Sequence, residues 1–189
     1  MKYLFLFFIM CIGRTQASSC RIRTVRKLDL DKYSGRWFEM YNSLIPRLTF
    51  QRNSFCTTAT YTIVGDSIRV LNAGRRGGPR GLSNTADGTA TRPNPRKYPG
   101  EIIVNFPGGS PPSTSPNYLV VKLGPVVNGK YDYAIVTTVN KAYFWILARD
   151  VNTFRVKYEQ SLLEYASCNG YNTNYNRPLK SVQGVECVY

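Results

Sequence analysis

The chain has 189 residues, and its 25 lysines and arginines outnumber its 11 acidic residues, which gives a formal net charge of +14. It contains no histidine, so we exclude imidazole-based catalytic triads, His-ligated haem and His-rich metal sites. The positive charge favours an anionic partner such as a membrane or polymer surface. Nucleic-acid binding is not expected, because no basic helix, RNA-binding strand signature or zinc-finger spacing is present.

The first residues have the pattern of a secretory signal. Lys2 is followed by an apolar run over residues 3–12, and a polar stretch then ends in Gln16-Ala17-Ser18. This run is shorter than the stretch of about 20 apolar residues that spans a bilayer. A basic residue, a short apolar run and a small residue at the end are typical of a signal peptide. We therefore predict a signal peptide over residues 1–17, a single domain over residues 18–189, and a secreted, extracellular protein.

Four cysteines remain after the predicted signal: Cys20, Cys56, Cys168 and Cys187. An even number of cysteines in an oxidising compartment predicts two disulfides. Three connectivities are possible, and the residues alone do not choose between them. The spacing of these cysteines matches no zinc site, and we expect neither a bound metal nor a cofactor.

Short strands separated by turn residues make up most of the mature chain. Two hairpin turns are marked by Gly65-Asp66 and by Val127-Asn128-Gly129-Lys130. One helical pattern follows the strands over Phe154–Ser167, and Asn169-Gly170 ends it. The predicted strands are Arg36–Asn42, Phe55–Val64, Ser67–Asn72, Asn84–Thr91, Gly100–Phe106, Tyr118–Leu123, Tyr131–Thr138 and Ala142–Arg149.

Eight short antiparallel strands and one helix indicate an all-β fold, an up-and-down β-barrel with a single C-terminal helix on its flank. The interior of such a barrel can hold one small ligand. Gly35 and Trp37 stand at the start of the first strand, and Arg149 ends the last. We expect the indole to plug the barrel floor and the guanidinium to pack across it, a contact worth about 0.5–2 kcal/mol. A barrel closed at one end favours binding over catalysis.

Four segments carry a resemblance to a known family: residues 28–40 with Gly35-Arg36-Trp37, residues 56–61, the run 143–149, and residues 184–189. The chain resembles the lipocalins, and within them the group of apolipoprotein D and the bacterial and plant outer-membrane-type lipocalins. The resemblance implies a non-enzymatic carrier of a small hydrophobic or amphipathic ligand, such as a fatty acid, retinoid, bilin, carotenoid or sterol. The Thr-Asp-Tyr motif of the family is not clean here, since Leu123-Gly124-Pro125 stands roughly in its place and the turn up to Tyr131 is longer.

The resemblance also suggests how the cysteines pair. Cys56 and Cys187 fall where relatives join the second strand to the C-terminal tail. Relatives bond the N-terminal cysteine to the seventh strand, where this chain has Thr137-Thr138. That difference leaves Cys168 as the partner for Cys20.

Side chains alternate in direction along a strand, and this alternation predicts which of them point into the barrel. Leu147, Trp145 and Tyr143 share the face of Arg149, and Glu39 and Tyr41 share the face of Trp37. The predicted cavity residues are Glu39, Tyr41, Ala59, Tyr61, Ile63, Ala134, Val136, Tyr143, Trp145 and Leu147. At the open end, Arg75 and Arg76 are predicted to grip a carboxylate or phosphate head group.

We expect the protein to be a monomer or a weak dimer. Three other functions remain open. Capture of siderophores needs cationic side chains in the cup, and the positions predicted on the last strand include no lysine. An isomerase of the lipocalin type needs a free thiol near the cavity, for which Cys56 is the candidate unless it forms a disulfide. An interaction protein would use the basic outer surface on an anionic membrane or polymer around a filled barrel.

Overall fold

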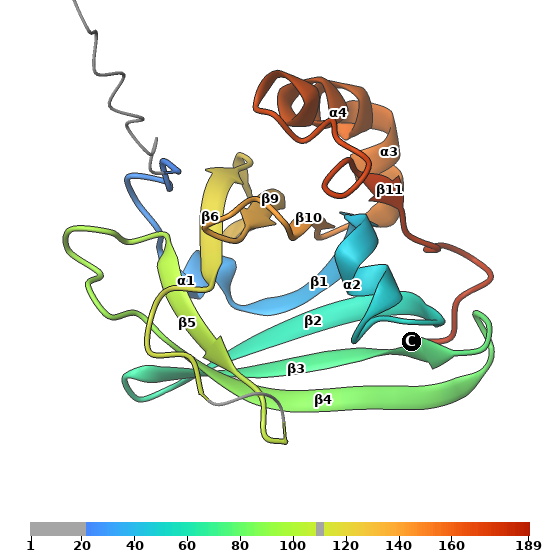
Figure 1. Cartoon of the computed structure of the whole chain (residues 1–189), viewed down its shortest axis with the longest axis horizontal. Coiled ribbons are helices and arrows are strands. Elements are labelled where there is room, and N and C mark those ends of the chain that lie inside the picture. The colour runs from blue at the N-terminus through green and yellow to red at the C-terminus, as the bar shows by residue number, and fades with distance from the viewer. Residues whose placement is uncertain (1–21, 109–111) are drawn as a thin grey trace, which may run out of the picture.

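The computed structural model describes residues 22–108 and 112–189 (Figure 1). The predicted signal peptide over residues 1–17 and the predicted disulfide partner Cys20 lie outside these residues. Eight strands form the wall of a barrel, and each corresponds to a predicted strand. They are β1 (Gly35–Asn42), β2 (Ser54–Val64), β3 (Ser67–Arg76), β4 (Leu82–Thr91), β5 (Glu101–Asn105), β6 (Tyr118–Leu123), β9 (Tyr133–Thr137) and β10 (Phe144–Ala148).

The eight strands pair in the order β10-β9-β6-β5-β4-β3-β2-β1, every pair is antiparallel, and β1 also pairs with β10 to close the cylinder. The predicted eight-stranded up-and-down barrel is therefore confirmed. Strand β11 (Leu179–Lys180) adds to this sheet beside β1, and β7 (Val126–Val127) and β8 (Lys130–Tyr131) form a separate two-stranded sheet. Asn128 and Gly129 join β7 to β8 with φ values of 50° and 75°, the left-handed conformations that a two-residue hairpin requires.

The C-terminal helix is present but divided in two. Helix α3 (Val151–Lys157) and helix α4 (Glu159–Cys168) meet at Tyr158, whose φ and ψ of −124° and −26° interrupt the helical geometry. Both lie on one flank of the barrel (Figure 1). Nowhere in residues 22–108 and 112–189 is there a helix with the length and apolarity to cross a membrane.

Two hydrophobic cores result from the alternation of side chains along the strands. On β10, Trp145 and Leu147 point into the barrel core, whereas Phe144 and Ile146 point outward to the helices. Ala134 and Val136 of β9 are fully buried inside the barrel. The outer core is completed by residues of the two helices, which are Phe154, Leu162 and Ala166.

Strand β1 breaks this alternation and corrects one prediction. Trp37 and Glu39 face the interior, but the pairing of β1 with β10 shifts register between Glu39 and Tyr41. A β-bulge of this kind places two consecutive residues on one face, here Met40 and Tyr41 on the outer face. Tyr41 therefore packs against the helices instead of lining the cavity.

Arg149 closes one end of the barrel. Its guanidinium carbon lies 3.6 Å from the centroid of the Trp37 ring, and the indole is fully buried. The guanidinium also donates hydrogen bonds to five backbone carbonyls, those of Lys32, Tyr33, Ser34, Arg36 and Tyr131. Three of these carbonyls lie in or next to helix α1 (Leu30–Tyr33). Gly35 has a φ of 91°, and this left-handed backbone favours glycine. A Cβ at this position would lie 3.4 Å from Arg149 Nη1.

The opposite end of the barrel stays open. Helix α2 (Leu44–Leu48), which the sequence did not predict, occupies the loop between β1 and β2 at this end. Strand β4 pairs with β5 at Thr89–Thr91 only, so its residues 82–88 have β3 as their one neighbouring strand. The wall between β4 and β5 therefore separates toward the open end.

Replacement of Arg149 by alanine should lower the free energy of unfolding by about 3 kcal/mol. The five carbonyls lose a charged donor and the indole loses its cation, and a single hydrogen bond to a charged group contributes about 1.5–3 kcal/mol. Urea unfolding followed by tryptophan fluorescence measures the change. Arg69→Ala is the control, because Arg69 forms an exposed ion pair with Asp87 that contributes about 1 kcal/mol at most. Similar small effects of both substitutions would contradict the role of Arg149.

Candidate functional site

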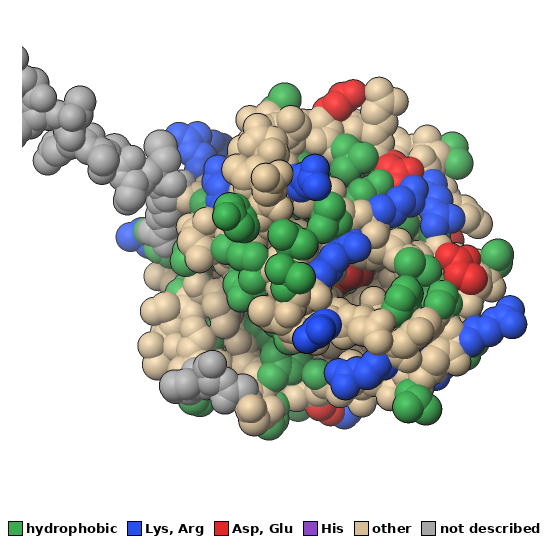
Figure 2. All heavy atoms as spheres, turned by 45° about the vertical axis from the view of Figure 1, so that its right-hand side comes forward, with side chains coloured by type: hydrophobic (Ala, Val, Ile, Leu, Met, Phe, Trp, Pro, Cys, Tyr) green, Lys and Arg blue, Asp and Glu red, His purple; other side chains and the backbone are tan. Residues whose placement is uncertain are grey.

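A cavity of about 310 Å³ occupies the open half of the barrel. Six of the predicted residues line it: Glu39, Ala59, Tyr61, Tyr143, Trp145 and Leu147. Figure 2 turns the open end toward the viewer and shows hydrophobic side chains around a hollow, with lysine or arginine side chains near it. The remaining lining residues are Phe50, Gln51, Thr57, Thr58, Val70, Asn72, Val104, Phe106, Asn117, Tyr118 and Thr138.

The other predicted ligand-binding residues lie elsewhere. Ala134 and Val136 are in the barrel core but outside the cavity wall. Ile63 is 38 % exposed and does not line the cavity, because β2 extends past the closed end of the barrel. Arg75 donates a hydrogen bond from Nε to the carbonyl of Val188, and Arg76 is exposed at the end of β3. Neither arginine lines the cavity.

Some cavity residues were missed by the sequence analysis although a signal for them existed. Val70 and Asn72 of β3 stand directly opposite Tyr61 and Ala59 of β2 in the ladder. Cross-strand partners share a face of the sheet, so the pairing places both residues in the wall. Alternation along the predicted strand Gly100–Phe106 likewise places Phe106 on the same face as Val104, and both line the cavity, although Phe106 lies just beyond the end of β5. Its ring packs where Gly88 lacks a side chain, since a Cβ there would lie 2.6 Å from the ring.

Aromatic rings form one side of the cavity. Tyr143 and Trp145 stack in nearly parallel planes, 4° apart, with ring centroids separated by 5.8 Å. Phe50, from the loop between β1 and β2, lies 5.9 Å from Tyr143. Flat aromatic surfaces with few polar atoms are typical of pockets that bind small apolar molecules.

Glu39 is the acidic residue of the cavity wall. Its side chain accepts hydrogen bonds from Gln51 Nε2 at 2.5 Å and from Ser181 Oγ at 2.9 Å. Burial raises the pKa of Glu39 to about 7, although the two hydrogen bonds and the positive charge of Arg47 act in the opposite direction. Arg47 itself is engaged with Asn42 and with the carbonyls of Leu179 and Lys180.

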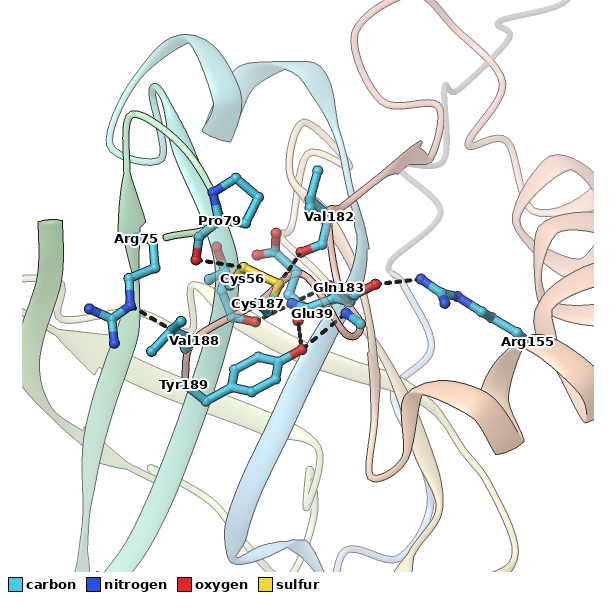
Figure 3. Close-up of a disulfide and its surroundings, with 12 residues drawn as sticks. Glu39, Cys56, Arg75, Pro79, Arg155, Val182, Gln183, Cys187, Val188 and Tyr189 are labelled. Carbon is cyan, nitrogen blue, oxygen red and sulfur yellow. Dashed lines mark hydrogen bonds between the residues drawn. A yellow bond between two sulfur atoms is a disulfide. The ribbon is translucent and has the colours of Figure 1, made fainter. Parts of the chain in front are cut away.

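The C-terminal segment, residues 179–189, holds this part of the wall in place (Figure 3). Cys187 forms a disulfide with Cys56, the pairing that the resemblance implied. The side chain of Gln183 donates to the carbonyls of Glu39 and Thr57, so it bridges β1 and β2. Its own side-chain oxygen accepts from Tyr189, and its backbone carbonyl accepts from Arg155 of α3.

The second predicted disulfide has one member within the described residues. Cys168 ends helix α4, is exposed, and forms no disulfide with any residue of the described ranges. Its predicted partner, Cys20, lies outside them, so this pairing stays a prediction. Within the same ranges, no group of three or more Cys, Asp or Glu side chains is arranged to hold a metal ion.

Comparison with known proteins identifies the family. The model of the lipocalin-like domain matches residues 28–180. The chain belongs to the lipocalin family. It is 31 % identical to temperature-induced lipocalin-1 of Arabidopsis thaliana over 156 residues, which cover 80 % of this chain and 78 % of that protein. It is 29 % identical to the outer membrane lipoprotein Blc of Vibrio cholerae over 167 residues, 87 % of this chain and 86 % of that protein.

Solved structures support the same assignment at the level of the fold. Insecticyanin from the tobacco hornworm Manduca sexta superposes with a TM-score of 0.62 at 18 % identity, covering 89 % of this lipocalin and 88 % of insecticyanin. Lipocalins are mostly non-enzymatic binding proteins, and membership of the family implies a small hydrophobic ligand.

Glu39→Gln should change the pH dependence of stability. The carboxyl has a pKa of about 7 in the folded chain and about 4.3 when unfolded. The folded state thus binds the extra proton between these values, and the stability of the wild type falls as pH rises through that range. From pH 4 to pH 8 the wild type should lose about 3 kcal/mol relative to Glu39→Gln in urea unfolding.

The control for this experiment is Glu164→Gln, which removes an exposed carboxyl on α4. It should leave the pH dependence as in the wild type. Parallel pH profiles for Glu39→Gln and the wild type would show that Glu39 titrates as an ordinary exposed carboxyl.

Proposed function

We propose that this lipocalin is a secreted carrier that binds one small hydrophobic molecule in its cavity and catalyses no reaction. The observation that carries the proposal is the cavity itself, which is closed below by Trp37 and Arg149 and walled by stacked aromatic rings. A ligand that buries about 300 Å² of apolar surface gains roughly 7 kcal/mol before the costs of association. Micromolar affinity is the expected result.

Several observations support a carrier over the alternatives. Cys56 is in a disulfide, so it offers no thiol for an isomerase of the lipocalin type. Lysine and arginine are both missing from the residues that line the cavity in the described part of the chain, which argues against capture of a ferric siderophore. The same composition favours a neutral or weakly polar ligand over an anionic one, since an unpaired buried anion is costly.

Secretion is part of the same proposal. The N-terminal signal pattern and the disulfide between Cys56 and Cys187 both fit an oxidising compartment. The similarity to an outer membrane lipoprotein fits a protein that leaves the cytoplasm. We propose that residues 18–189 form the mature protein as one domain.

Filling the cavity should abolish ligand binding. Ala59→Trp places an indole among the lining side chains, and we expect at least a tenfold loss of affinity for a neutral fluorescent probe such as N-phenyl-1-naphthylamine. The measurement is a titration followed by probe emission. The matched control is Thr62→Trp, which adds the same side chain at an exposed position of the same strand and should leave the affinity unchanged. Equal affinities for both variants would place the probe outside the barrel.

A surface at the open end supports a second function, docking on an anionic membrane. Exposed apolar and basic side chains meet there, and we call them the rim patch: Leu48, Phe50, Arg52, Arg76, Arg80 and Leu82. The three apolar members are 65 %, 60 % and 81 % exposed, and the arginines are exposed as well. Their loops meet at one end, because the N–H of Gly77 donates to the carbonyl of Asn53 at 3.1 Å. Phe50 also lines the cavity, so a membrane bound here would adjoin the ligand site.

Vesicle binding tests the rim patch. The wild type should co-sediment with vesicles that contain phosphatidylserine and only weakly with pure phosphatidylcholine, and salt should release it. Arg76→Gln with Arg80→Gln should weaken this binding about tenfold or more, since each basic residue near an anionic surface contributes about 1 kcal/mol. Arg69→Gln with Lys97→Gln removes two exposed charges from other parts of the chain. Equal losses in the two double variants would attribute the binding to net charge instead of the rim patch.

A further inference from the structure

Three tyrosine hydroxyls meet at the floor of the cavity. They come from three separate elements: Tyr33 ends α1, Tyr61 belongs to β2, and Tyr118 begins β6. The hydroxyl of Tyr118 lies 2.6 Å from that of Tyr33 and 2.8 Å from that of Tyr61. Tyr118 is therefore the middle member of a chain of three phenols.

A count of protons shows that this chain is incomplete. Each phenol carries one O–H proton, and each hydrogen bond uses one. Three protons are available for two hydrogen bonds, and within the described residues these hydroxyls make no other hydrogen bond. Whichever way the hydroxyls turn, one proton is left without an acceptor from the described protein groups. A buried donor without a partner is costly, which favours an acceptor supplied from outside the chain.

Two of the three hydroxyls that can carry the spare proton face the cavity. Tyr61 and Tyr118 both line the cavity, whereas Tyr33 lies beneath them against Trp37. Burial raises the pKa of Tyr61 to about 12 and the pKa of Tyr33 and of Tyr118 well above the usual value. All three phenols therefore keep their protons at neutral pH and act as donors.

The surrounding charges favour an acceptor that is polar but neutral. Burial raises the pKa of Tyr33 and Tyr61, and the positive charge of Arg149 acts against that rise at both residues. The positive potential of Arg149 attracts the oxygen end of a dipole. The guanidinium itself is occupied by five backbone carbonyls. It lines no part of the cavity and so makes no ion pair with a carboxylate there. An anion at this depth would remain unpaired, at a high cost in solvation.

We propose that the phenol chain binds a carbonyl oxygen, so that this lipocalin takes apolar ligands that carry a ketone or aldehyde group at their buried end. The inference rests on the proposed carrier function and adds to it the class and the orientation of the ligand. The oxygen end enters first and accepts a hydrogen bond from Tyr61 or Tyr118. The apolar remainder lies along Ala59, Val70 and Leu147 toward the open end.

Two ligands of nearly the same shape test this proposal. 2-Acetylnaphthalene carries a carbonyl where 2-ethylnaphthalene carries a methylene group. In the double variant Tyr61→Phe/Tyr118→Phe, the affinity for the ketone should fall about three- to tenfold relative to the affinity for the hydrocarbon, the effect of one neutral hydrogen bond. Displacement of N-phenyl-1-naphthylamine measures all the affinities. The control, Tyr133→Phe, removes a phenol on the outer side of the barrel and should leave the ratio of affinities unchanged.

A spectroscopic measurement on the wild type makes the test independent of any variant. The infrared C=O stretch of bound 2-acetylnaphthalene should lie at lower wavenumber than in hexane, because the carbonyl accepts a hydrogen bond. A stretch at the hexane position, or an equal loss of affinity for both ligands in the double variant, would overturn the inference while leaving the carrier function intact. Failure of both ligands and of the probe to bind the wild type would contradict the carrier function and the inference with it.

Discussion

The set of hydrogen bonds from the Arg149 guanidinium to backbone carbonyls is the constraint on which the rest of the structure depends. The acceptors belong to the segment before and at the start of β1 and to Tyr131, next to β9, so one side chain ties the first strand to the last part of the wall. The cylinder closes where β1 pairs with β10, and Arg149 follows the last residue of β10. Trp37 lies under the same guanidinium and donates a hydrogen bond to the carbonyl of Tyr33 at 2.8 Å. Arg149 therefore holds both the indole at the barrel floor and Tyr33, the phenol at one end of the chain of three.

The open end is organised by a different device, the C-terminal segment. Strand β2 pairs with β1 only from Gly35 to Phe38, and β11 takes its place beside Tyr41 and Asn42. The disulfide between Cys56 and Cys187 fixes this segment across a separation of 131 residues. Ser181 then reaches the carboxyl of Glu39 at 2.9 Å. The cavity wall at this level is therefore built from residues that are remote in sequence, which local patterns do not reveal.

The sequence predicted the fold well because its main signals are local. Alternation along β10 and β9 placed Trp145, Leu147, Ala134 and Val136 on the inner face, and those positions are correct. The same argument failed for Tyr41, because a β-bulge changes the parity of a strand and leaves no mark in composition. Helix α2 was missed because five residues around Pro46 are too few to show a helical period. Tyr118 was predicted only as the start of a strand, since its meeting with Tyr33 and Tyr61 arises from barrel closure.

Net charge proved a poor guide to the cavity, and the reason is physical. A formal charge of +14 favoured an anionic partner, and Arg75 and Arg76 were predicted to hold an anionic head group at the open end. In the structure two arginines at this end of the barrel have other acceptors: Arg47 donates to the carbonyls of Leu179 and Lys180, and Arg75 donates to the carbonyl of Val188. Charged groups remain near water or bind backbone oxygens because an unpaired charge in an apolar cavity is costly. The polar groups of the cavity are instead neutral phenols at its floor, neutral amide and hydroxyl side chains in its wall, and a carboxyl with a pKa of about 7. The basic side chains and the cavity side chains are therefore different residues. A substitution can change the surface charge without changing the ligand site.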